Sequence, residues 1–167
     1  LRDEYRLPPL MFNSEELKAL ALGAQMVHAW SDKKLASTTA TAIRKIESVL
    51  PERLKKEIKL NAIKVPGFQM SEGLSNNLEM VRVASEESKK LEVCYRSLRG
   101  EETRRTIWPL ILYFWGNKWT LGAWCELRKD FRSFRVDLMF EVVDSGETFA
   151  TTSDRNLQAY IDYQAEE

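Results

Sequence analysis

Apolar residues recur with a helical period through the first half of the chain. Asn13 followed by Glu16 is the capping-box pattern of a helix start, and the apolar spacing after it continues to about Trp30. The same spacing predicts a second helix from about Lys34 to Leu50. Pro51 is predicted to open a short third helix, because its fixed φ suits the first helical position.

The period changes near residue 90. Ser75 is predicted to cap a fourth helix over about Asn76–Lys89, and beyond it the pattern becomes that of strands. The predicted strands are Leu91–Ser97, Arg105–Trp115, Lys118–Glu126 and one or two more within Phe131–Val143. Pro109 donates no backbone hydrogen bond, so it marks an edge strand or a bulge. Gly116-Asn117 suits a two-residue hairpin turn.

The predicted fold class is α+β, with an N-terminal helical segment followed by a small five-stranded β-barrel. A barrel is favoured because five short strands joined by tight turns lose their exposed edges on closure. Alternation over Lys118–Glu126 places Trp119, Leu121, Ala123 and Cys125 on one face, and Thr120, Gly122, Trp124 and Glu126 on the other. A weak last helix is predicted over Ser153–Tyr163.

Composition adds one feature to this picture, an uneven distribution of charge. The 167 residues have a formal net charge of zero, 44% are hydrophobic and no run of eighteen apolar residues occurs. A core is therefore expected and a membrane span is not. Residues 104–137 carry seven basic and three acidic side chains, whereas residues 138–167 carry one basic and seven acidic. The positive centre suits phosphate or carboxylate groups, and the acidic tail is expected to shield it or compete for it.

Residues of the kind that carry out catalysis are scarce. His28 is the only histidine and lies on a predicted helix, so a hydrolase triad and a histidine-based metal site are not expected. Neither GxGxxG nor GxxxxGK[ST] occurs. Cys94 and Cys125 are interpreted as free thiols of a reducing cytoplasm. The sequence therefore predicts a cytoplasmic protein that is not an enzyme and holds no cofactor or metal.

A basic cluster is the stronger signal, within eight residues: Arg128, Lys129, Arg132 and Arg135. Guanidinium groups bind phosphate or carboxylate through a rigid fork of donors, although solvated charge on a surface hairpin has the same composition. Arg132 and Arg135 lie three residues apart, so a straight strand places them on opposite faces and only a bulge or turn makes them converge. Asp130 and Asp137 are expected to orient these guanidinium groups.

Tryptophans are the second candidate for recognition. Four of them lie in the predicted barrel: Trp108, Trp115, Trp119 and Trp124. Their ordinary role is in a core, but one that is exposed beside an arginine offers a surface on which a base stacks.

Residues 105 to 137 resemble the signature of the WYL-domain family. The resembling positions are Arg105-Thr106-Ile107-Trp108-Pro109-Leu110, Trp119-Thr120-Leu121, Cys125-Glu126-Leu127-Arg128, Asp130, Arg132, Phe134-Arg135 and Asp137. Leu91 to Tyr95 resembles the entry into that domain. The helical first half resembles the segment that precedes the domain in YafY-like, DeoR-type bacterial transcriptional regulators, so the resemblance covers nearly the whole chain.

This resemblance implies an Sm-like, SH3-type barrel that senses a nucleotide or single-stranded nucleic-acid ligand in a homodimeric regulator. Operator DNA would be contacted only through an N-terminal helix-turn-helix domain, which these residues lack. It implies a helical linker or dimerisation segment at 1–74, the barrel with its leading helix at 75–145 and the start of a C-terminal extension at 146–167. The ligand-binding positions carried over from the motif are Trp119, Thr120, Arg128, Arg132 and Arg135.

Two positions depart from the motif. Thr120 stands where the family has Tyr, and Leu138 stands where its last Arg is expected. One stacking surface and one charge are therefore lost, which favours an alternative in which the chain is a dimerisation module without a small ligand. A third hypothesis, an enzyme that acts on nucleotides, has no supporting residues.

Overall fold

A computed structural model describes residues 10–59, 63–66 and 70–165. The chain forms two compact units, Leu1–Gln69 and Met70–Glu167, and each is described by itself. Within the described residues no helix combines the length and the apolar character that crossing a bilayer requires.

The first unit consists of helices α1 (Ser14–Trp30), α2 (Lys33–Val49) and α3 (Glu52–Lys59). The predicted capping box is confirmed, because the Asn13 side chain accepts from the Glu16 amide at 2.9 Å and Glu16 accepts from the Asn13 amide at 2.8 Å. Pro51 was predicted to be the first helical residue, but α3 begins one residue later, at Glu52. It precedes the helix, and its carbonyl accepts the amides of Leu54 and Lys55.

Helix α4 (Glu72–Glu86) opens the second unit, and its predicted cap was wrong. Ser71 caps it, accepting from the Leu74 amide at 3.3 Å, whereas Ser75 lies inside the helix and is only 4% exposed. Both serines have the right chemistry, but the cap at Ser71 adds a helical turn and places Glu72 near the positive end of the helix dipole. The helix stops before Lys89 because Ser88 adopts a left-handed φ of 53°.

Ser71→Ala is expected to lower the free energy of unfolding of this unit by about 1 kcal/mol, because it leaves an amide of the first turn without its side-chain acceptor. Urea unfolding of the purified chain measures the change. Ser153→Ala is the matched control, since Ser153 is exposed and lies before α5 rather than at the cap of a helix. Equal losses in both variants would contradict the assignment of the cap.

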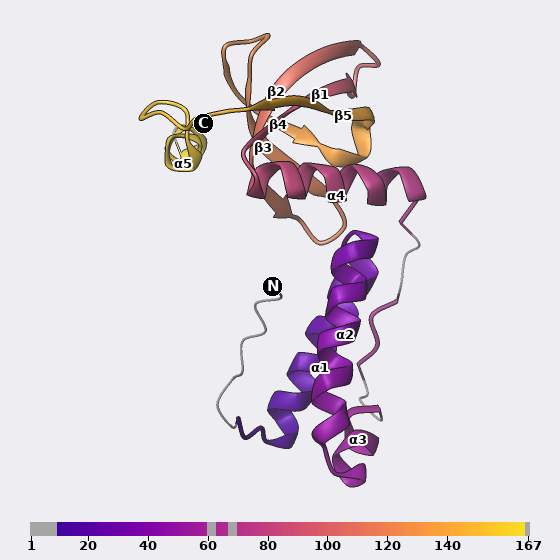
Figure 1. Ribbon diagram of the computed structural model, residues 1–167. Helices are drawn as coiled ribbons and strands as arrows, with labels where there is room; N and C mark the ends of the chain where they lie inside the picture. The colour runs from indigo at the N-terminus through magenta and orange to yellow at the C-terminus, as the bar shows by residue number, and fades with distance from the viewer. Residues whose placement is uncertain (1–9, 60–62, 67–69, 166–167) are drawn as a thin grey trace. The chain divides into compact units, whose positions relative to one another are not determined.

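Five antiparallel strands follow α4 in one sheet of order β4-β3-β2-β1-β5 (Figure 1). Their bounds are β1 Lys89–Arg96, β2 Glu102–Phe114, β3 Trp119–Cys125, β4 Asp130–Arg135 and β5 Met139–Thr148. A 3₁₀ turn at Val136–Leu138 joins β4 to β5, and helix α5 (Leu157–Ala165) ends the described chain. The α+β class and the five strands are confirmed. No ladder joins β4 to β5 among the residues described, so closure into an Sm-like barrel stays a prediction.

Pro109 marks a bulge and not an edge. Strand β2 is the middle strand of the sheet, and its register with β3 shifts between Pro109 and Ile111. Its pairing with β1 ends at Ile107, opposite Leu91, two residues before the proline. The missing N–H of Pro109 is therefore accommodated where the ladder is already irregular.

The Gly116-Asn117 turn is confirmed as a two-residue hairpin. The Trp115 amide donates to the Lys118 carbonyl at 2.9 Å, and Gly116 has a φ of 79°. A positive φ at the first central position alone is the type II′ geometry, which favours glycine there. The hairpin places Trp115, in the turn that follows β2, beside Thr120 of β3.

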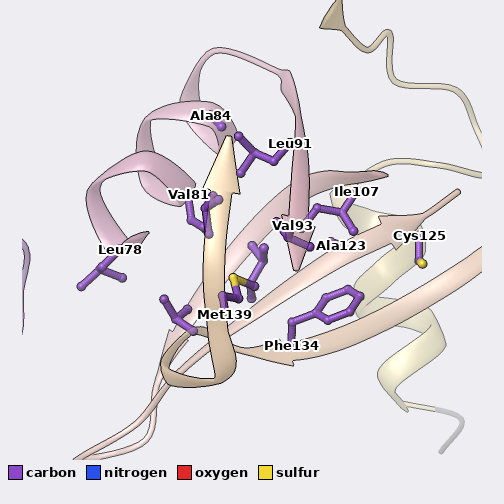
Figure 2. Close-up of a cluster of buried hydrophobic side chains, with 13 residues drawn as sticks. Leu78, Val81, Ala84, Leu91, Val93, Ile107, Ala123, Cys125, Phe134 and Met139 are labelled. Atoms are coloured by element: carbon purple, nitrogen blue, oxygen red, sulfur yellow. The ribbon is translucent and has the colours of Figure 1, made fainter. Parts of the chain in front are cut away.

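The two faces of β3 have different partners. One face carries Leu121, Ala123 and Cys125 into the main core, where Leu78, Val81 and Ala84 of α4 meet the apolar side chains of all five strands (Figure 2). The remaining members of this core are Leu91, Val93, Ile107, Phe134, Val136, Met139 and Val142. On the opposite face, Tyr160 of α5 packs against Gly122 and bonds the hydroxyl of Ser133 at 2.8 Å. Helices α4 and α5 thus lie on opposite sides of the sheet.

Candidate functional site

Three strands align polar side chains on the face of the sheet that bears α5. Thr120 of β3 lies opposite Tyr113 of β2 and opposite Arg135 of β4. Directly opposed residues of antiparallel strands project to the same face. Tyr113, Thr120 and Arg135 therefore form a row across the sheet, which together with Trp115 is called the three-strand platform below.

Trp115 supplies the exposed aromatic surface of this platform. Its side chain is 66% exposed, its indole N–H donates to the Thr120 hydroxyl at 2.8 Å, and its ring centroid lies 5.8 Å from that of Tyr113. The sequence motif pointed to Trp119 and Thr120 and missed Tyr113 and Trp115. Both residues could have been predicted from the sequence. The alternation along β2 and the two-residue hairpin together bring residues 113 and 115 beside residue 120.

Arg135 is held by a carboxylate that it shares with a lysine. Arg135 donates to both oxygens of Asp137, at 3.1 Å from Nε and 2.7 Å from Nη2, and Lys118 donates to the same carboxylate at 2.9 Å. Hydrogen bonding from Arg135, reinforced by Lys118, lowers the pKa of Asp137 to about 2. The predicted role of Asp137 in orienting Arg135 is confirmed.

The arginines do not form a single cluster. The β3–β4 ladder runs without a shift from Thr120–Arg135 to Cys125–Asp130, so Arg132 and Arg135 project to opposite faces, as their spacing predicts for a straight strand. Arg132 donates to Asp130 at 2.6 Å and to the Tyr163 hydroxyl of α5 at 3.0 Å. Asp130 thus orients Arg132, as predicted.

The other two motif positions lie apart from the row. Arg128 is exposed in the turn between β3 and β4, and its side chain has no hydrogen-bonding partner within residues 10–59, 63–66 and 70–165. Trp119 packs beside the main core, with its ring centroid 5.0 Å from that of Phe114. Among the five ligand-binding positions carried over from the motif, the sheet brings only Thr120 and Arg135 into direct opposition.

Comparison with known proteins shows what this chain is similar to. Residues 76–143 match the family model of the WYL domain. The uncharacterized HTH-type transcriptional regulator YobV of Bacillus subtilis is 27% identical over 153 residues, which are 89% of this chain and 48% of that protein. The chain thus spans about half the length of this curated relative. Among solved structures, proteasome accessory factor B/C (PafBC) of Arthrobacter aurescens is 24% identical with a TM-score of 0.46, over 86% of this chain and 22% of that one.

Proposed function

Because this chain carries a WYL domain over residues 76–143, we propose that it is the ligand-sensing part of a bacterial transcriptional regulator. Its ligand in this proposal is an anionic nucleotide or a single-stranded nucleic acid. The relative YobV is named as a regulator of the HTH type, which supports a regulatory role for this chain. Operator DNA would be bound by a separate helix-turn-helix domain, in a cytoplasmic homodimer.

The exposed indole of Trp115 beside Thr120 and Arg135 is the observation that carries this proposal. Single-stranded nucleic acids are bound by aromatic rings on which bases stack and by cations that hold the backbone. The three-strand platform offers both within one row of the sheet. The platform also replaces the stacking surface that is lost where Thr120 stands in place of the motif's Tyr. The Thr120 hydroxyl holds the indole of Trp115 at that position.

The remaining motif residues have more distant roles in this proposal. Arg135 binds a phosphate by exchanging part of its contact with Asp137. The exposed Arg128 lies in the turn at the other end of β4, so it meets a more distant phosphate of the same nucleic-acid strand. Arg132 and Trp119 support the Sm-like sheet around the platform. Ligand binding changes the regulator only if the ligand prefers one of two arrangements of the dimer.

Trp115→Ala is expected to weaken binding of a fluorescently labelled oligonucleotide of about ten nucleotides by about tenfold, because one stacked base is lost. Trp115→Phe is expected to retain most of the affinity, since it keeps a ring. Fluorescence anisotropy at low and high salt measures both, and binding should weaken as salt rises.

Arg104→Ala is the matched control for charge. Arg104 is an exposed arginine paired with Glu141, and lies on β2 beyond the residues that form the platform. Its loss is expected to weaken binding far less than the loss of Arg135. Equal effects at both arginines would show nonspecific attraction, and undiminished binding by Trp115→Ala would exclude the platform.

A dimerisation module without a small ligand is the second candidate, and the first unit favours it. An apolar groove of about 800 Å³ runs between α1 and α2, and its lining includes Leu20, Ile43 and Met11, which is 96% exposed. A second copy of the chain covering this groove would remove apolar surface from water. Sedimentation velocity over a concentration series, with Leu20→Glu as the variant, tests this candidate independently of any ligand.

A further inference from the structure

A second pocket lies at the other end of the face that carries the platform. Its volume is about 380 Å³, and it is lined by Trp108, Trp124, Glu126, Lys129 and Arg155. Trp108 and Trp124 are directly opposed on β2 and β3, so both indoles project to this face. Arg155 comes from the segment between β5 and α5. Three separate parts of the chain thus bring two large aromatic rings and two cations together.

Arg155 is held in the pocket by aromatic rings. Its guanidinium lies 4.7 Å from the ring centroid of Trp124 and 5.9 Å from that of Trp108. Its Nε is buried and makes no hydrogen bond within the described chain, and the carboxylate of Asp154 approaches it only to 3.5 Å. The Arg155 side chain as a whole is 42% exposed, so a ligand in the pocket meets its exposed part and not the buried Nε.

The carboxylate in the pocket lining, that of Glu126, already has hydrogen-bonding and ionic partners. Glu126 accepts from the Trp108 indole N–H at 2.7 Å and pairs with Lys90 at 3.0 Å. These contacts, with the Trp108 hydrogen bond first, lower the pKa of Glu126, so it stays charged at neutral pH.

Lys129 is the second cation of the lining. It is exposed, and its side chain has no hydrogen-bonding partner in the part of the chain that the structure describes. With two cations and one anion, the lining carries a net charge of plus one.

We propose that this pocket binds a small aromatic carboxylate, with the carboxylate on Arg155 and Lys129 and the ring against the two indoles. A volume near the lower end of ligand pockets suits a small molecule rather than an oligonucleotide. A net charge of plus one matches a monoanion better than a phosphate dianion. Guanidinium and carboxylate form charge-assisted hydrogen bonds of matched geometry, and stacked rings add to them.

The pocket is distinct from the three-strand platform. Thr120 and Trp124 are four residues apart on β3, about 13 Å along a strand. Tyr160 covers Gly122 between them, so a small ligand at one position does not reach the other. Binding of a small ligand in the pocket can therefore be tested independently of nucleic-acid binding at the platform.

Titration of the whole chain with 2-naphthoate tests the proposal, followed by the indole N–H signals in two-dimensional NMR. Saturable shifts are expected at Trp108 and Trp124, which Trp→Phe variants assign, with little change at Trp115. Arg155→Gln and Lys129→Asn are each expected to weaken binding about tenfold. Asn suits position 129 because Lys129 has a φ of 52°.

Two controls separate this pocket from general attraction. Lys118→Gln removes a cation beside the platform and is expected to leave 2-naphthoate binding unchanged. The neutral 2-naphthamide is expected to bind about tenfold more weakly, and the dianion 2-naphthyl phosphate no more tightly than the carboxylate. Equal binding of the amide, a preference for the phosphate, unchanged binding by both pocket variants, or a loss on Lys118→Gln would each overturn the proposal.

Discussion

Gly122→Ala is expected to lower the free energy of unfolding of the second unit by about 3 kcal/mol. A Cβ at this position would overlap the ring of Tyr160 and lie 2.8 Å from its hydroxyl oxygen. The ring cannot yield easily, because Tyr160 is only 1% exposed, its hydroxyl is bonded to Ser133, and its edge contacts Phe131 at a centroid distance of 5.7 Å. The new methyl group must therefore displace α5 or distort β3.

Urea unfolding followed by tryptophan fluorescence in a Trp30→Phe background measures this loss, because the four remaining tryptophans belong to the second unit. Gly73→Ala is the matched control. An added Cβ at residue 73 meets no described heavy atom within 4 Å, and alanine favours a helix over glycine, so no loss is expected.

Gly122→Ala in a Tyr160→Ala background distinguishes two causes of the loss, a clash with the Tyr160 ring and a backbone conformation that only glycine adopts. Gly122→Ala should then cost little, because the ring that it meets is gone. A cost of about 3 kcal/mol in both backgrounds would show that residue 122 is constrained by the strand and not by Tyr160.

Asp137→Asn is expected to lower stability at pH 7 by about 2 kcal/mol and at the same time to strengthen binding of an anionic oligonucleotide. Bonds from Arg135 and Lys118 hold the pKa of Asp137 at about 2, below its ordinary value of 3.8. A group whose pKa is lower in the folded state stabilises the fold above its unfolded pKa, and this stabilisation is lost as pH falls toward the folded value. The contribution of Asp137 should therefore disappear between about pH 4 and pH 2.

Urea unfolding from pH 7 to pH 2 measures this effect as a difference between the variant and the unchanged chain. The difference should close below about pH 4. Asp162→Asn is the control, because Asp162 is an exposed carboxylate on α5 whose hydrogen bond is to Gln158. A pH-independent difference would mean that Asp137 acts through packing and not through its charge.

Binding by the same variant tests the platform from the opposite direction. Asp137→Asn leaves Arg135 and Lys118 without their shared carboxylate, so both cations become more available to phosphates. We expect a severalfold gain in oligonucleotide affinity with a steeper salt dependence. Weaker binding would mean that Asp137 is needed to position Arg135 for the ligand.

The sequence predicted the elements of this fold better than their contacts. The helical and two-residue periods located the helices and the first three strands, whereas β4 and β5 were predicted only as one or two strands within Phe131–Val143 and β5 continues to Thr148. The spacing of Arg132 and Arg135 predicted opposite faces for a straight strand and left a bulge open. The cap at Ser71 was missed because Ser75 has the same local chemistry and only the packing of α4 distinguishes the two. Local patterns thus determine the period but not always the first residue of an element.

The two surfaces proposed for recognition depend on contacts between residues that local sequence patterns do not reveal. Trp115 becomes part of a site only through the register that places it beside Thr120. Arg155 lies 31 residues after Trp124, in an acidic segment where the sequence predicted the start of a helix. The helix begins only at Leu157, and the guanidinium of Arg155 covers the ring of Trp124. Resemblance to the WYL motif pointed to Thr120 and Arg135 but not to Tyr113 of β2 or to Trp115 in the turn that follows it.

The type II′ hairpin at Gly116-Asn117 has a thermodynamic consequence for recognition. Its two-residue length and the hydrogen bond from the indole to Thr120 fix the ring of Trp115 before any ligand arrives. A ligand that stacks on a ring already in place loses less conformational entropy on binding than one that must first order a loop. Phenylalanine at residue 115 would present a similar face without that anchor, so its binding should be opposed by a larger entropy loss even where the enthalpy of stacking is preserved.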